Sequence, residues 1–269
     1  MKENSEQISF NANLLLKSST EVKKCNIVSF NGEYGVVNNK GETILPVLYN
    51  RIKYHSKDKL LVATIGMSSD NRSDEIFDEK GVKVFGGKGH FIGQDFFDGY
   101  AAYTNRKWKM TLINTKGELL TEPKYDIVHF SSGFYRDLVV VELRQKEIYQ
   151  SDKLQQIKND IKKFFGKTFE KDARHETRWL AEDISDFLCE QETETLFKYD
   201  FIHSMWSSIH GLLNKKGEEV IAPRFAEINL YQKEENVMLV KMPLHPIQCR
   251  YKCCYVDTRT GEFIKEQKR

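Results

Sequence analysis

One short phrase recurs along this chain of 269 residues and limits the folds open to it. The phrase is an apolar pair, an Asn or Asp, two or three polar residues and a glycine. Its five copies occupy residues 36–41, 76–81, 112–117, 212–217 and 255–261. The closing glycines are 40, 36, 100 and 44 residues apart, so one repeat of roughly 40 residues carries roughly 60 extra residues. A period of this length indicates a repeat architecture.

The phrase has the chemistry of a tight β-hairpin turn. Asn and Asp fold their side chains onto the backbone ahead, and glycine takes the positive φ that closes the turn. In three copies a proline and then an aromatic residue follow the second apolar run, and these aromatics are Tyr49, Tyr125 and Phe225. Proline cannot donate to a sheet ladder, so we expect it at a strand end or edge, and the aromatic in the core.

This order of residues resembles the WG-repeat family of bacterial proteins. The resemblance rests on Tyr34-Gly35 with Gly41, Pro46 and Tyr49, on Trp108 with Gly117, Pro123 and Tyr125, and on His210-Gly211 with Gly217, Pro223 and Phe225. It covers about three quarters of the chain, although no copy holds a literal Trp-Gly and the units at 75–104 and 251–264 lack the proline. The resemblance implies a β-rich repeat fold and a binding or surface module rather than an enzyme.

The segment 144–209 does not follow the repeat. Its apolar residues Leu154, Ile157 and Ile161 have helical spacing up to Gly166, and a second helical pattern follows Asp172. We therefore predict an all-β fold of about five antiparallel β-meander repeats, closed like a propeller or open as a solenoid, with an inserted α-helical hairpin. The expected organisation is units 1–3 over residues 1–143, the helical insertion over 144–209, and units 4–5 over 210–269, continuous with the first part.

The insertion has an uneven charge. Residues 151–178 hold eight basic and five acidic side chains, whereas residues 179–200 hold one basic and seven acidic ones. Either the two faces attract and dock on each other, or they form a charged docking surface for another protein. The second interpretation gives the predicted binding residues Lys162, Lys163, Lys167, Arg174, Arg178, Trp179, Glu182, Asp183 and Asp186.

Motifs for catalysis or metal binding are weak. The densest metal-like group is His245, Cys249, Cys253 and Cys254. Structural zinc commonly uses Cys-x2-Cys pairs, and two adjacent cysteines in a predicted strand should point to opposite faces. The glycine-rich segment 86–93 fails the phosphate-loop pattern, and no serine lies in a G-x-S-x-G elbow. We therefore predict no catalytic residue, no metal and no cofactor.

Composition bears on three further questions, which are nucleic-acid binding, membrane insertion and cellular location. The formal charge is +2, from 41 basic and 39 acidic residues, which gives no reason to expect nucleic acid. No apolar run is long enough to span a membrane. Five irregularly spaced cysteines without an export signal favour reduced thiols and a cytoplasmic location.

The predicted function is a non-catalytic protein–protein interaction module, a β scaffold that binds another protein, with the helical insertion as the candidate binding surface. Two alternatives stay open. One is an immunity or antitoxin-like partner in a bacterial conflict system, and the other is an enzyme with a site built across the repeat loops.

Overall fold

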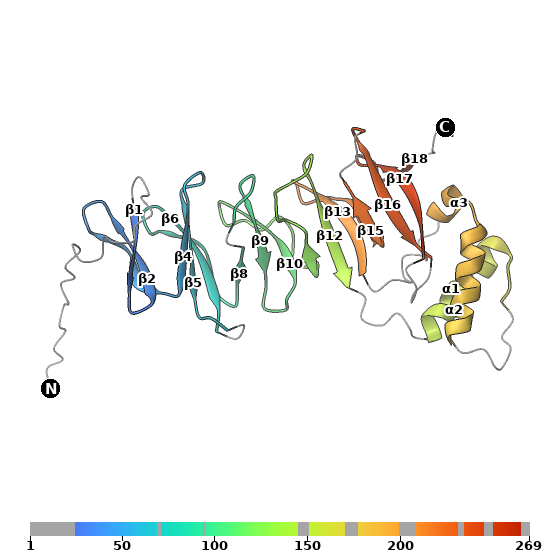
Figure 1. Cartoon of the computed structure of the whole chain (residues 1–269), viewed down its shortest axis with the longest axis horizontal. Helices are drawn as coiled ribbons and strands as arrows, with labels where there is room; N and C mark the ends of the chain where they lie inside the picture. Colours follow the sequence, from blue (N-terminus) through green and yellow to red (C-terminus); the bar gives the residue numbers. More distant parts are fainter. Residues whose placement is uncertain are drawn as a thin grey trace. The chain divides into compact units, whose positions relative to one another are not determined.

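The computed structural model describes residues 25–68, 71–93, 95–144, 151–169, 177–198, 208–230, 234–244 and 250–264. The chain divides into two compact units, Met1–Pro123 and Lys124–Arg269. In both units the described strands pair in antiparallel order with their neighbours along the chain (Figure 1). Each sheet is therefore a meander, which is the arrangement that short hairpin turns produce.

The first unit contains three of these meanders. The first sheet comprises β1 (Cys25–Phe30), β2 (Glu33–Asn38) and β3 (Thr43–Tyr49). The second comprises β4 (Arg51–His55), β5 (Leu60–Ile65), β6 (Ser73–Asp78) and β7 (Lys83–Lys88). The third comprises β8 (Phe91–Ile92), β9 (Tyr100–Thr104) and β10 (Met110–Asn114).

The second unit contains two four-stranded meanders and the helices. One sheet comprises β11 (Ile127–Val128), β12 (Leu138–Arg144), β13 (Ser208–Asn214) and β14 (Glu219–Phe225). The other comprises β15 (Glu227–Asn229), β16 (Val237–Pro243), β17 (Tyr251–Asp257) and β18 (Phe263–Ile264). Helices α1 (Ser151–Phe165), α2 (Thr177–Glu190) and α3 (Thr193–Phe197) lie between β12 and β13 in the chain, so they interrupt a hairpin of the first of these sheets.

The repeated phrase forms the same turn in four of its five copies. In the first copy, Asn38 Oδ1 accepts hydrogen bonds from the backbone N–H of Lys40 and Glu42, each 2.9 Å long. Gly41 closes the turn at φ 82° and donates to the carbonyl of Asn38. Asp78, Asn114 and Asn214 accept the corresponding pair of bonds in their own turns. The shared sequence therefore encodes a shared conformation through local hydrogen bonds.

The last copy of the turn adds an ion pair that should respond to acid. The hydrogen bond from the Arg259 side chain lowers the pKa of Asp257 to about 2. Because the unfolded value is about 3.9, this contribution to stability is complete above that pH and is lost as the pH falls towards 2. We expect Asp257→Asn, which keeps the turn acceptor but not the charge, to show a weaker loss of stability across this range. Urea unfolding at several acidic pH values measures it, with the exposed Asp98→Asn as control. Identical pH slopes for Asp257→Asn and wild type would contradict the assignment.

In two copies, the aromatic residue at the start of the repeat is followed by a glycine, Gly35 or Gly211. Another backbone segment lies so close to this position that only glycine fits. A Cβ placed on Gly35 would lie 2.9 Å from the carbonyl oxygen of Leu45, and one on Gly211 would lie 2.5 Å from that of Ile221. In both copies the pairing of the glycine strand with the next strand shifts register at this point. Irregular pairing thus brings the backbone of the proline-containing strand over the glycine.

The turn glycines pack against the preceding sheet of their own unit. A Cβ on Gly81 would lie 2.5 Å from the carbonyl oxygen of Ile44, and one on Gly117 would lie 2.9 Å from that of Val84. In the second unit, Gly261 approaches the carbonyl of Val220 in the same way, at 3.1 Å. Within each unit the turn of one sheet therefore sits against the last strand of the sheet before it.

The aromatic residues after the prolines fill the core, as the sequence predicts. Tyr49 is 5% exposed, Tyr125 is fully buried and Phe225 is 1% exposed. The Tyr125 hydroxyl donates a hydrogen bond of 2.6 Å to Glu219, so the polar end of this buried ring has a partner. Burial raises the pKa of the Tyr125 hydroxyl, which keeps it protonated as the donor.

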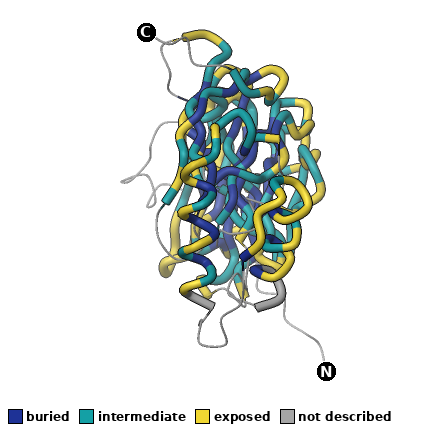
Figure 2. The backbone as a smooth tube through the Cα atoms, turned by 90° about the vertical axis from the view of Figure 1, so that its right-hand side faces the viewer, coloured by how far each residue is buried: buried dark blue, intermediate teal, exposed yellow. Residues whose placement is uncertain are grey.

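The helices pack on the sheets of the second unit. Leu154, Ile157 and Ile161 of α1 share one core cluster with Ile184 and Leu188 of α2 and with strand residues such as Met238 and Met242. The tube in Figure 2 alternates between buried and exposed colours along its helical turns, as amphipathic helices require. Figure 1 shows the helices beside β17. The apolar face of the insertion is thus used within the protein.

The structure confirms the predicted fold class. Antiparallel meanders dominate both units, and the three described helices fall inside the predicted insertion. The boundaries at residues 143 and 209 concern the repeat units and the insertion, and they stay a prediction. The two compact units divide at another place in the chain, after Pro123. Within the described ranges, no helix has the length and apolar character to cross a membrane.

Candidate functional site

The basic residues predicted to bind a partner lie at the end of α1 and after it. Lys162 and Lys163 occupy the last turn of α1, and Lys167 follows the helix; all three are exposed. No carboxylate of the described residues forms an ion pair with them. Arg174 lies outside the described residues, and Arg178 belongs to α2 without a described side chain. The positive charge of this helix end is therefore directed at solvent.

The acidic residues of α2 are used differently. Asp183 and Asp186 are exposed and Glu182 is half-buried. Asp186 forms an ion pair of 2.5 Å with Arg250, whose guanidinium also donates to Ser185 Oγ at 3.3 Å. Part of the acidic face thus binds the protein's own β sheet rather than the lysines of α1.

Two aromatic side chains remain exposed on the insertion. Phe164 of α1 keeps 46% of its surface exposed and Trp179 of α2 keeps 55%. The ammonium group of Lys163 lies 5.0 Å from the centre of the Phe164 ring. Large aromatic residues are enriched at protein-binding surfaces.

The structure describes two members of the cysteine group, Cys253 and Cys254. Cys254 is buried in the core cluster of the second unit, whereas Cys253 is exposed. Adjacent strand residues point to opposite faces, as predicted. His245 and Cys249 lie outside the described residues.

A histidine–carboxylate cluster lies in the second unit instead. Glu142 of β12 pairs directly with His210 of β13, and His129 follows the end of β11 on the other side of β12. The Nε2 atoms of His129 and His210 lie 3.3 and 3.6 Å from Glu142 Oε2. Three neighbouring chain segments of one sheet therefore direct donor atoms at one point, and these atoms all lie within 4.8 Å of one another.

The environment of Glu142 favours its ionised form. Burial by itself would raise the pKa of this carboxyl, but hydrogen bonds from Ser208 and Arg144 and the nearby His210 lower it below its usual value. Ser208 Oγ lies 2.7 Å and Arg144 Nε 3.3 Å from Glu142 Oε1. Both donors use Oε1, so Oε2 is the oxygen that faces the two histidines.

The cluster borders a cavity of about 290 Å³. His129 and His210 line it together with Ser131, Ser132 and Tyr135. Sequence reasoning missed this site because its residues are far apart in the chain and lack metal-ligand spacing. The available signal was His210, a histidine at the aromatic position of a repeat.

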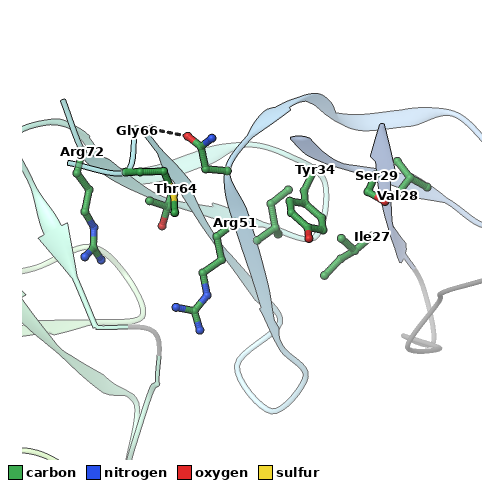
Figure 3. A pocket seen from close by; sticks show the side chains of 11 residues that line it. Ile27, Val28, Ser29, Tyr34, Arg51, Thr64, Gly66 and Arg72 are labelled. Atoms are coloured by element: carbon green, nitrogen blue, oxygen red, sulfur yellow. Dashed lines mark hydrogen bonds between the residues drawn. The ribbon is translucent and has the colours of Figure 1, made fainter. Parts of the chain in front are cut away.

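The first unit has a larger cavity, of about 470 Å³, between its first two sheets. Arg51 of β4 and Arg72 before β6 line it, and Figure 3 shows their side chains extending to the same side. Tyr34 lies across from them, and Asn50 accepts a hydrogen bond of 2.6 Å from the backbone N–H of Gly66. Arg72 also pairs with the buried Asp74 at 2.8 Å, so this arginine has a structural role.

Comparison with known families identifies the repeat. The model of the WG containing repeat matches residues 34–62, 110–136 and 211–242. The chain carries WG-containing repeats. The resemblance seen in the sequence is thereby confirmed for the three copies that keep the proline. The WG repeats thus take the conformation described above, in which Gly35 and Gly211 lie beneath a neighbouring strand.

Solved structures resemble the WG-repeat chain only distantly. A computationally designed protein, Ika8, shares 8% identity over 92% of this chain and 59% of its own, with a TM-score of 0.31. The β-propeller domain of the Trilobed protease from Pyrococcus furiosus shares 11% over 89% and 66%, with a TM-score of 0.31. BamB from Moraxella catarrhalis shares 13% over 47% and 39%, with a TM-score of 0.27. The chain spans less than two thirds of each of these structures, and no curated protein matches it.

Proposed function

We propose that this WG-repeat protein is a non-catalytic binding module that engages an acidic protein partner through its helical insertion. The observation that carries the proposal is the pair of exposed aromatics, Phe164 and Trp179, on helices whose other large apolar side chains, where described, are buried or partly buried. Exposed tryptophan and phenylalanine are more often retained where they contribute binding energy.

The charge around Phe164 at the end of α1 specifies the partner. Lys162, Lys163 and Lys167 are exposed and have no carboxylate partner among the described residues. The interpretation in which the two helices neutralise each other therefore receives no support from these lysines. A partner that presents carboxylates around an apolar pocket would complement both the lysines and the two rings.

The acidic face of α2 supports the antitoxin-like alternative less well. That alternative requires the acidic segment to cover a basic target. Asp186 is already paired with Arg250, and Lys252 Nζ donates a hydrogen bond to the backbone carbonyl of Gln191 at the end of α2. Part of this surface is thus used to attach the insertion to the protein.

The proposal predicts that two variants lose the partner. We expect Phe164→Ser/Trp179→Ser, and separately the charge reversal Lys162→Glu/Lys163→Glu/Lys167→Glu, to weaken binding at least tenfold, since hot-spot residues contribute about 2 kcal/mol or more. Affinity capture from an extract of the source cells, followed by mass spectrometry and titration of the captured protein, measures the effect.

A matched control separates this surface from charge in general. The variant Lys40→Glu/Lys80→Glu/Lys116→Glu makes the same charge change at exposed turn lysines of the repeats. We expect it to keep the partner. Equal loss in the control variant, or a partner retained by both insertion variants, would refute the assignment to the insertion.

A further inference from the structure

We propose that His129, Glu142 and His210 bind one divalent transition-metal ion. In a tetrahedral site with bonds of about 2.0–2.1 Å, neighbouring ligand atoms are about 3.3 Å apart. The two histidine nitrogens lie 3.3 and 3.6 Å from Glu142 Oε2. Two of the three donor separations are therefore close to those that a shared ion requires, and all three donor atoms lie within 4.8 Å of one another before any adjustment of the side chains.

The hydrogen bonds around His210 leave two acceptor atoms facing each other in the cluster. Its Nδ1 lies 3.3 Å from the backbone carbonyl oxygen of Phe225, and a carbonyl can only accept, so Nδ1 carries the hydrogen. In the neutral ring Nε2 is then an acceptor, and it faces the carboxylate oxygen of Glu142. Two acceptors at this distance need either an added proton or a cation between them. A single metal ion would satisfy His210, His129 and Glu142 together.

The surrounding contacts fix the ligands in place. Phe225 orients His210, and Ser208 and Arg144 hold the other oxygen of Glu142. Such outer hydrogen bonds to ligating histidines and carboxylates are common in metal sites. Arg144 is the nearby cation that opposes metal binding, but its side chain is largely exposed and contacts Oε1 rather than Oε2.

The cavity leaves room for the remaining ligand. Both histidines line the space of about 290 Å³ that also contains Ser131 and Tyr135. Three protein ligands and one open position suit Zn²⁺, Co²⁺ or Ni²⁺, for which imidazole is a good ligand. Water or a small oxygen-donor molecule would complete the coordination.

Isothermal titration of Zn²⁺ into the EDTA-treated and desalted full chain tests the site. We expect one equivalent to bind, and His129→Gln, His210→Gln and Glu142→Gln each to weaken binding at least tenfold. His129 is half exposed, so its variant should fold normally. Ser208→Ala, which removes only a hydrogen bond to Glu142, should weaken binding by about tenfold.

Control variants exclude other donors. His90→Gln changes a histidine whose Nδ1 lies 2.6 Å from the Tyr103 hydroxyl in the first unit, and Cys253→Ser removes an exposed thiol. Both should leave the affinity unchanged, and Co²⁺ should give a visible absorption that is lost in His129→Gln. The proposal is overturned if none of Zn²⁺, Co²⁺ and Ni²⁺ binds saturably at tenfold excess over the protein. It is also overturned if His129→Gln or Glu142→Gln binds as tightly as the wild type.

Discussion

Replacing Gly81 with alanine is expected to destabilise the protein by about 2–5 kcal/mol. Gly81 has φ 81°, a conformation that costs an L-residue with a side chain about 1–2 kcal/mol. In addition, the new Cβ would lie 2.5 Å from the carbonyl oxygen of Ile44 in the preceding sheet. Backbone atoms cannot rotate away, so the two sheets must separate, and overpacking of this kind costs about 1–3 kcal/mol.

A second glycine separates these two contributions. Gly32 has φ 84°, but a Cβ there would meet nothing within 4 Å. Gly32→Ala should therefore lose only the conformational part, about 1–2 kcal/mol. Urea unfolding followed by circular dichroism gives both values. If Gly81→Ala costs no more than Gly32→Ala, the turn does not hold the sheets together in the way the structure indicates.

This pair of glycines also shows what sequence reasoning could and could not find. The turn at Gly81 was predictable because its hydrogen bonds join residues within one phrase, from Asp78 to Val82. The contact with Ile44 was not, because it depends on how one sheet is placed against another. Local chemistry fixes the hairpins, and tertiary packing decides which strand lies over each glycine.

One further copy of the turn escaped the pattern altogether. Asn105 accepts hydrogen bonds from the backbone N–H of Lys107 and Lys109, as Asn38 does in its own turn. The position that glycine holds elsewhere is Trp108, at φ 59°. The indole stacks on Phe91 with ring centres 5.0 Å apart, a contact that offsets part of the strain. A search for glycine cannot recognise such a turn.

The two candidate sites differ in the same way, since one depends on local sequence and the other on tertiary structure. The insertion was predictable because charge and helical spacing are local properties, and its lysines lie at the surface as amphipathic patterning implies. The cluster of His129, Glu142 and His210 was not, because strand pairing alone brings these residues together.

Replacing Asp74 with alanine is expected to cost about 3–5 kcal/mol, the effect of removing one partner from a buried ionic network. Asp74 is fully buried in β6. Its carboxylate accepts hydrogen bonds from Thr64 Oγ1 at 2.6 Å, from the Ile92 backbone N–H at 2.8 Å, and from the Arg72 guanidinium at 2.8 Å. Since Ile92 belongs to β8, this one side chain joins the second and third sheets of the first unit.

An exposed aspartate provides the control for Asp74. Asp95 forms an ion pair with Lys53, and the side chains of Asp95 and Lys53 keep 57% and 37% of their surface exposed. Surface pairs contribute about 0–1 kcal/mol, so Asp95→Ala should change the free energy of unfolding by less than that. Urea unfolding of the two variants measures the contrast. Equal costs would mean that the network around Asp74 does not stabilise the junction of the two sheets.

A double-mutant cycle shows where the cost of losing Asp74 originates. If most of it comes from buried donors left without an acceptor, removing one of those donors should recover part of it. Thr64→Val deletes the hydroxyl that Asp74 binds while keeping the size of the side chain. We therefore expect Thr64→Val/Asp74→Ala to be less destabilised than the sum of the single variants, with a coupling of about 0.5–3 kcal/mol. Additive costs would instead assign the loss to the contacts with Ile92 and Arg72, which Thr64→Val does not touch.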